Sequence, residues 1–306
     1  MTLRMTLSAL ALLSGAVPAL AQDACTSVSL SDVGWTDITA TTSAAKQVLE
    51  GLGYEVDVQV LGVPVTFEAL STGDIDVFLG NWMPSQTAAI QSYLDEGTIE
   101  TLGVNLEGTK YNLAVPAYLY DQGLHTYEDM AEFKDALGGE IYGIEPGNEG
   151  NTYLISLTEP GGPFEGFTVV ESSEQGMLAQ VQSAVEEQAP VVFLGWEPHP
   201  MNANFPLKYL EGGDDFFGGQ GNVYTVTRKG FAADCPNVAK LLTNMQFTLP
   251  MENEMMGAIL DEGKDPDTAV KDWLVAHPDT IGPWLDGVTT VDGGDGLAAV
   301  TSAMGL

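Results

Sequence analysis

The chain has 306 residues, 44% of them apolar, and 10 basic against 43 acidic side chains give a formal charge of −33. So few Lys and Arg side chains argue against binding to nucleic acids and to anionic membrane surfaces, because both need cations that replace counterions. The apolar content predicts a folded protein, and the length allows two domains. The negative charge favours solubility, and its field would attract cationic ligands.

The first 21 residues predict an export signal that is not part of the fold. Arg4 provides a basic start, residues 7–17 form a short apolar run, and Ala19-Leu20-Ala21 resembles a signal-peptidase site. The run is too short for a stable membrane span. No Cys follows the cleavage site directly, so we expect no lipid anchor and a soluble mature chain that begins after Ala21.

Two cysteines remain, Cys25 and Cys235. In an exported protein we expect them to form a disulfide, which in the entropic model would add roughly 4–5 kcal/mol for so long a loop. Two free buried thiols are the alternative. A bridge would place the mature N-terminus and the region around residue 235 in one domain.

Predicted strands and helices alternate along the chain. Apolar side chains at helical spacing predict a helix at 43–52, and alternation of apolar and polar side chains predicts a strand at 54–60. Similar patterns predict further strands at 75–79, 141–144, 167–170 and 191–194, and further helices at 64–73, 126–137, 172–188, 236–245, 251–260, 268–276 and 278–285. This order predicts an α/β fold with largely parallel sheets.

Two pairs of segments repeat a pattern. Residues 77–84 and 192–198 each combine an apolar strand, a Gly and a Trp beside a Pro, and residues 28–35 and 141–148 each combine a strand, a turn and the start of a helix. The repetition predicts two related α/β lobes. Since ligands of open α/β sheets gather at the carboxyl ends of the strands, we expect Trp35, Trp82 and Trp196 on exposed loops around one crevice between the lobes.

The five Trp residues divide into two groups. Trp273 and Trp284 fall on apolar helix faces and are predicted to lie in the core. Each of the other three could fold back on its own domain, but their shared placement favours a binding site. Several indole faces suit a quaternary ammonium ion, which carries a full charge and has no N–H to donate. Four rings would supply on the order of 4–8 kcal/mol, sufficient for micromolar affinity.

Seven segments carry a resemblance that extends along essentially the whole mature chain: SDVGWTDITATT (31–42), GDIDVFLGNWMP (73–84), YLDEGTIETLGVNLEGTKYNLAVP (93–116), KDALGGEIYGIEPGNEGN (134–151), VESSEQGMLAQV (170–181), VVFLGWEPHPMN (191–202) and KYLEGGDD (208–215). In them the chain resembles choline-binding periplasmic proteins of bacterial ABC importers, within the wider glycine betaine/choline-binding group. The resemblance implies a two-lobed type II periplasmic-binding-protein fold that closes around its ligand. It also implies a membrane permease and an ATPase as partners. We expect a periplasmic location, no cofactor and no metal. We expect a monomer.

The resemblance also implies the site and the lobes. It places an aromatic box on Trp35, Trp82, Tyr111 and Trp196, and a polar pair that holds the ligand's hydroxyl on Asp37 and Asn148. Sequence pattern alone would not select Tyr111 over Tyr118 or Tyr120. Lobe 1 would comprise residues 22–109 and 218–306, lobe 2 residues 110–217, with hinge crossings near 107–112 and 212–223. The second crossing is rich in Gly, which suits bending.

Charge indicates which quaternary ammonium compound binds. Choline ends in a hydroxyl and betaine in a carboxylate, and an ionised Asp37 would accept the hydroxyl proton and repel the carboxylate. Lys110 adjoins the box, but as a strand neighbour of Tyr111 it should point to the opposite face. We therefore predict choline as the ligand, with glycine betaine, carnitine and acetylcholine as alternatives.

A choline-ester hydrolase is the rival of a different class. The chain contains no H-E-x-x-H, C-x-x-C or G-x-S-x-G motif, and of its three His residues only His199 adjoins the proposed crevice. We expect a structural or surface role for His199. A structural or adhesive protein fits poorly with three Trp residues in turns, so we predict a binding protein that is not an enzyme.

Overall fold

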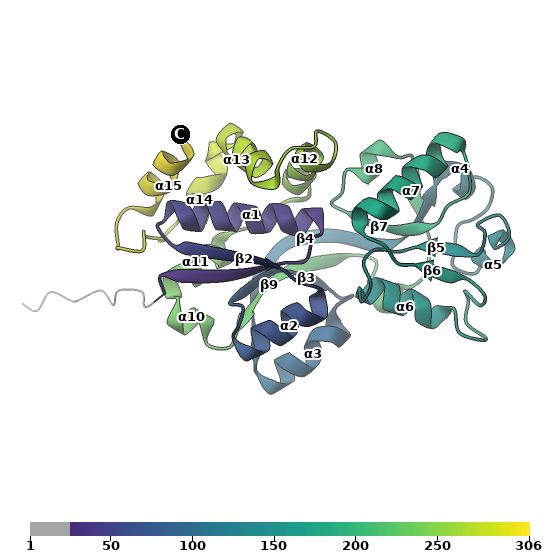
Figure 1. The fold of residues 1–306 in the computed structure, drawn as a ribbon, viewed down its shortest axis with the longest axis horizontal. Coiled ribbons are helices and arrows are strands. Elements are labelled where there is room, and N and C mark those ends of the chain that lie inside the picture. Colours follow the sequence, from purple (N-terminus) through teal and green to yellow (C-terminus); the bar gives the residue numbers. More distant parts are fainter. Residues whose placement is uncertain (1–24) are drawn as a thin grey trace, which may run out of the picture.

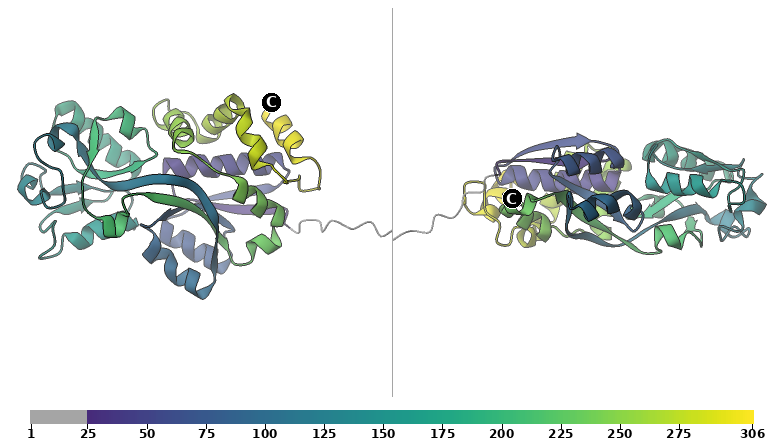
Figure 2. Two further views of the ribbon diagram at one scale, coloured as in Figure 1. Left: turned by 180° about the vertical axis from the view of Figure 1, so that it is seen from behind. Right: turned by 90° about the horizontal axis from the view of Figure 1, so that it is seen from below.

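The structure is a computed structural model that describes residues 25–306, and the predicted export signal lies outside the described residues. Figure 1 shows two lobes side by side, with the long strand β4 running from one into the other. The views from behind and from below in Figure 2 show the same division, with the C-terminus at the end of lobe 1 that is remote from lobe 2.

Lobe 1 is built on a mixed sheet in the order β2-β1-β3-β9-β4. Strand β1 is parallel to β2 and β3, whereas β9 is antiparallel to β3 and β4. Figure 1 shows α1 on one side of this sheet and α2 and α3 on the other. The elements are β1 (Ser27–Asp32), α1 (Thr36–Gly51), β2 (Glu55–Val60), α2 (Val63–Thr72), β3 (Val77–Met83), α3 (Thr87–Glu96), β4 (Ile99–Pro116) and β9 (Gly221–Arg228).

Lobe 2 repeats the plan with shorter strands. Strand β5 is parallel to β6 and β7, and the second half of β4 is antiparallel to β7 and β8. Its elements are α4 (Ala117–Tyr120), α5 (Met130–Phe133), β5 (Glu140–Tyr142), α6 (Glu149–Leu157), β6 (Thr168–Val170), α7 (Glu174–Glu187), β7 (Phe193–Glu197), α8 (Met201–Asn204), β8 (Leu207–Tyr209) and α9 (Asp214–Phe217).

The C-terminal third returns to lobe 1 as a group of helices. Helices α12, α13 and α15 lie on the side of α1 that faces away from the sheet (Figure 1). The elements are α10 (Phe231–Asp234), α11 (Pro236–Asn244), α12 (Leu249–Leu260), α13 (Pro266–Ala276), the 3-10 helix η1 (Pro278–Thr280), α14 (Ile281–Trp284) and α15 (Gly296–Met304).

The predicted two-lobed α/β architecture is confirmed, with two differences in detail. The outer strands of each lobe are parallel as predicted, but antiparallel pairs are added by β9 in lobe 1 and by β4, which runs from one lobe into the other. The predicted helix at 126–137 has one α-helical turn, α5. Its capping box is nevertheless formed: the Asp129 carboxylate accepts from the Thr126 N–H at 2.8 Å, and the Thr126 hydroxyl accepts from the Asp129 N–H at 3.3 Å.

The two helical Trp residues differ in burial. Trp284 is buried, as predicted. The prediction is wrong in part for Trp273, which is half-buried. Its indole N–H donates to Glu254 at 2.6 Å and its ring stacks on His277, so the polar edge of the indole explains why it stays near the surface.

The predicted disulfide between Cys25 and Cys235 is present and joins residues 210 positions apart. It links the segment before β1 to the junction of α10 and α11. The bridge therefore ties the start of the described chain to the part of the chain that returns to lobe 1 after β9.

Replacing both cysteines by Ser is expected to lower the free energy of unfolding by about 2–4 kcal/mol, because the unfolded chain regains the freedom that the bridge removes. Chemical denaturation of the variant and of the oxidised protein measures the difference. Equal stability of the two proteins would contradict a stabilising role for the bridge.

Candidate functional site

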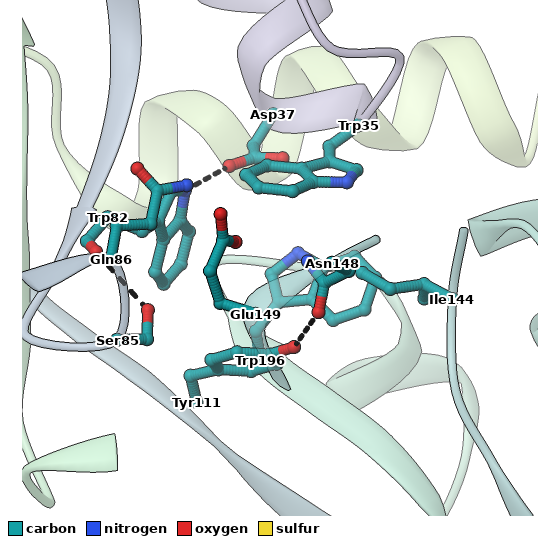
Figure 3. A pocket seen from close by; sticks show the side chains of 10 residues that line it. All are labelled: Trp35, Asp37, Trp82, Ser85, Gln86, Tyr111, Ile144, Asn148, Glu149 and Trp196. Carbon is teal, nitrogen blue, oxygen red and sulfur yellow. Dashed lines mark hydrogen bonds between the residues drawn. The ribbon is translucent and has the colours of Figure 1, made fainter. Parts of the chain in front are cut away.

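A small pocket lies where the lobes meet. Figure 3 shows the side chains that line it. All six residues predicted from the sequence are among them. The lining consists of Trp35, Asp37, Trp82, Ser85, Gln86, Tyr111, Ile144, Asn148, Glu149 and Trp196.

Lobe 1 contributes two indoles and a carboxylate. Trp35 precedes the first residue of α1, and the turn that delivers it is fixed by Asp32, whose carboxylate accepts from the Gly34 N–H and the Thr39 hydroxyl, each at 2.8 Å. Asp37 lies in the first turn of α1. Its Oδ2 accepts from the Trp82 indole N–H at 3.0 Å, which joins the end of β3 to the start of α1 (Figure 3).

Lobe 2 contributes the other two rings from neighbouring strands. Tyr111 of β4 and Trp196 of β7 are directly opposite each other in the antiparallel pair, so both side chains point to the same face. Their ring centroids are 6.5 Å apart at 85°, and those of Tyr111 and Trp82 are 6.3 Å apart at 63°. The rings meet edge to face and leave the pocket between them.

Asn148 connects this cage of rings to α6. Its Oδ1 caps the helix by accepting from the N–H groups of Gly150 and Asn151 at 2.8 and 3.2 Å, and it also accepts from the Tyr111 hydroxyl at 3.1 Å. A side chain at position 150 would collide with the Tyr111 hydroxyl, so this position requires Gly. Because Oδ1 is occupied and the side chain also interacts with the Glu145 carboxylate, one Nδ2 hydrogen is the donor that Asn148 can offer to a ligand.

The prediction that three Trp residues lie on exposed loops is wrong. Trp35, Trp82 and Trp196 are only 7%, 6% and 4% exposed, and the latter two lie within β3 and β7. The glycine before each strand Trp does not end the strand. A Cβ on Gly80 would meet the Phe78 ring, and the glycine therefore marks close packing.

Four lining residues were not predicted: Ser85, Gln86, Ile144 and Glu149. Each is next to or close to a predicted site residue or segment, and Glu149 directly follows Asn148. Closeness in the sequence to a predicted site residue was therefore the one signal that could have identified them. Three buried oxygens of the lining, on Asp37, Gln86 and Glu149, have no hydrogen-bond partner. Unpaired acceptors of this kind favour a ligand that brings positive charge or a donor.

Both acids of the pocket are held in a partly protonated range. Burial, with a smaller effect of the Glu174 charge, raises the pKa of Asp37 to about 8. Burial and the nearby Glu145 raise the pKa of Glu149 to about 7. Neither Lys nor Arg is among the residues that line the pocket. Lys110 instead lies over the ring of Tyr209, 4.1 Å from its centroid.

Two further carboxylates of lobe 2 hold the start of α1 in lobe 1. Glu174 accepts from the N–H and hydroxyl of Thr36 at 2.8 and 3.0 Å, and Glu145 accepts from the Trp35 indole N–H at 2.9 Å. These three hydrogen bonds cross the interface beside the pocket. The positive end of the helix dipole of α1 strengthens the contact with these carboxylates.

His199 contacts Glu174 outside the pocket. Its Nδ1 accepts from the Met201 N–H at 2.9 Å, so the proton is on Nε2, which lies 2.9 Å from the other oxygen of Glu174. The ring also contacts Trp196 edge to face at 4.8 Å. His199 therefore has a structural role beside the site, and it does not line the pocket.

The model of one family, the substrate binding domain of ABC-type glycine betaine transport systems (OpuAC), matches residues 26–276. The chain belongs to this family. The predicted type II periplasmic-binding-protein fold is confirmed by the likeness to its solved members. Members of this family are components of transport systems that bind a substrate.

Two solved structures are 57% identical to this chain and cover 92% of it. An ABC-transporter choline binding protein in complex with choline has a TM-score of 0.90, with 98% of that chain covered. The corresponding unliganded semi-closed conformation has a TM-score of 0.84, with 99% covered. The present structure is thus more similar overall to the structure with choline than to the unliganded one.

A third relative is the glycine betaine/carnitine transport binding protein GbuC of Listeria monocytogenes. It is 37% identical over 122 residues, a segment that spans 40% of this chain and 40% of the relative. No helix within residues 25–306 is long and apolar enough to cross a lipid bilayer.

Proposed function

We propose that this protein binds choline outside the cytoplasm and delivers it to an ABC importer composed of a membrane permease and an ATPase. The observation that carries the proposal is a closed cage of four aromatic rings that contains two acids, and no Lys or Arg, among its lining residues. The 57% identity to a choline binding protein supports the choice of ligand. The disulfide is typical of an oxidising compartment such as the periplasm.

The cage suits a trimethylammonium group because methyl groups cover its nitrogen and leave no proton to donate. Ring faces attract such a cation at little desolvation cost, with about 2 kcal/mol or more per ring in a dry site. The burial of Trp35, Trp82 and Trp196 keeps water from these faces. Apolar contact with the methyl groups adds to the attraction.

The polar end of the pocket suits a hydroxyl. The unpaired Oδ1 of Asp37 would accept the hydroxyl proton, and the Nδ2 group of Asn148 would donate to the hydroxyl oxygen. A bound cation favours the ionised form of Asp37, which counteracts the effect of burial on its pKa. Asp37 and Asn148 come from different lobes, so both contacts need the closed form.

Closure would occur by bending where the chain crosses between the lobes, near residues 107–112 and 212–223. Strand β4 changes partners between Thr109, which pairs with Gly221, and Lys110, which pairs with Glu197. We propose this change of partner as the limit between lobe 1 (22–109 and 218–306) and lobe 2 (110–217). Contacts of Glu145 and Glu174 with α1 would hold the closed form. We expect the protein to act as a monomer.

Glycine betaine is the second candidate, because the family model describes glycine betaine transport. Its carboxylate would lie near Asp37 and Glu149 with no cation among the lining residues to compensate. A choline-ester hydrolase is disfavoured for a different reason. The Ser85 hydroxyl donates to the Trp82 carbonyl at 3.2 Å, and no His among the lining residues could act as its base.

Titration of intrinsic Trp emission with choline tests the function. The Trp196→Ala variant is expected to weaken choline binding about 30-fold, which corresponds to about 2 kcal/mol for one enclosed ring. Trp273→Ala, which removes a half-buried indole remote from the pocket, is the matched control and should bind as the wild type does. No saturable binding of choline by the refolded, ligand-free wild type would exclude the proposed function.

The same titration distinguishes the two candidate ligands. We expect choline to bind at least about tenfold more tightly than glycine betaine, because ionised Asp37 accepts a hydroxyl and repels a carboxylate. Asp37→Asn should narrow this gap. Comparable affinities of the wild type for both ligands would contradict the assignment of choline.

Affinity for choline is expected to rise by about tenfold or more between pH 6 and pH 9. Protonated Asp37 and Glu149 are neutral, and their pKa values of about 8 and 7 mean that both lose a proton within this range and then attract the cation. The charged groups around Asp37 are Glu174 and Glu252, and the group beside Glu149 is Glu145, all acids. Calorimetry at constant ionic strength measures the affinity. A flat profile, or one that falls with pH, would contradict this account.

A further inference from the structure

Glu149 is an acid of the cage that the sequence analysis did not predict. It is the first residue of α6, and Figure 3 shows its carboxyl group pointing toward the indoles of Trp35 and Trp82. Its Oε1 is buried without a hydrogen-bond partner. The start of α6 does not need it as a cap, because Asn148 accepts from the first free N–H groups.

The surroundings of Glu149 make its charge costly. Asp37 of α1 lines the same pocket, and Glu145, in the loop before α6, lies close enough to raise the pKa of Glu149. Glu174 of α7 and the buried Glu252 of α12 both act on Asp37. The positive end of α6 offsets this repulsion only in part. A single cation held among the rings would offset more of it than any lining residue does.

We propose that Glu149 is a specificity-determining residue whose carboxylate serves as the counter-ion of the onium group inside the aromatic cage. This inference rests on the proposed function. It adds an acid to the aromatic box, to which alone the sequence analysis assigned the positive charge. Asp37 is held in place by the Trp82 indole and accepts the hydrogen bond of the ligand's hydroxyl. Glu149, whose Oε1 has no hydrogen-bond partner, interacts with the positive charge of the ligand.

A carboxylate inside the cage would affect which ligands the protein selects. Aromatic faces and apolar contact alone would also admit an uncharged molecule of the same shape, because methyl groups pack equally well around carbon. A carboxylate in the cage favours the charged form over this neutral analogue. It also disfavours a zwitterion, whose own carboxylate would enter a pocket that already contains two acids.

The test compares choline with its uncharged carbon analogue, 3,3-dimethylbutan-1-ol, in the wild type and in Glu149→Gln. We expect the variant to bind choline at least about tenfold more weakly and the neutral alcohol equally or more tightly, so that the ratio of the two affinities falls at least tenfold. Glu159→Gln removes an exposed acid of the same lobe and should leave the ratio unchanged. Glu149→Asp, which retains the negative charge, should keep most of the preference for choline over the neutral alcohol.

An unchanged ratio in Glu149→Gln would overturn the inference while leaving choline binding by the wild type, and hence the proposed function, intact. Failure of the wild type to bind choline would instead remove the proposed function itself. Should Glu149→Gln not fold, as judged by its near-UV circular dichroism, the Asp37→Asn variant decides, because Glu149 is then the remaining acid among the lining residues. The affinity ratio of Asp37→Asn should rise from pH 6 to pH 8, and a constant ratio would overturn the inference.

Discussion

Enclosure of a charge that cannot form hydrogen bonds is the constraint on which the rest of this structure depends. A trimethylammonium group must be attracted by ring faces and diffuse negative charge, and both act strongly only where water is excluded. One open lobe surface cannot exclude water from all sides of such a group. Two rings from each lobe, Trp35 and Trp82 opposite Tyr111 and Trp196, form a dry cage only when the lobes meet.

The bonds that hold the lobes together use the same short segment that builds the cage. Trp35 provides a ring face to the pocket and its N–H to Glu145, and the next residue, Thr36, binds Glu174. Glu174 is in turn held by His199, whose ring packs against Trp196. A change in the position of either indole is therefore transmitted to the contacts between the lobes. This links occupation of the cage to closure without a separate switch.

Local patterns in the sequence predicted most of the fold and three of the rings, but not what depends on contacts between distant segments. Trp82 and Trp196 were found because each lies between a Gly and a Pro after an apolar run, yet their burial was missed because the strands β3 and β7 continue through them. Tyr111 lies on β4, a long strand with polar residues and glycines that shows no alternation, and only the family resemblance identified it. Glu149 was overlooked because one acid next to a helix start is commonplace, and only the pocket shows that its carboxyl group enters the cage.

The acids explain how such a pocket tolerates being empty. Two carboxylates with full charge in a buried space without a cation would repel each other and the neighbouring Glu145 and Glu174. Burial instead raises the pKa of Asp37 and Glu149 toward neutrality, so that protons reduce the charge. An onium ion that binds neutralises the two carboxylates in place of the protons, which are then released. Either the protons or the onium ion therefore offsets the cost of burying the acids. A site with basic residues could not work in this way, because its cations would already neutralise the acids and repel the ligand.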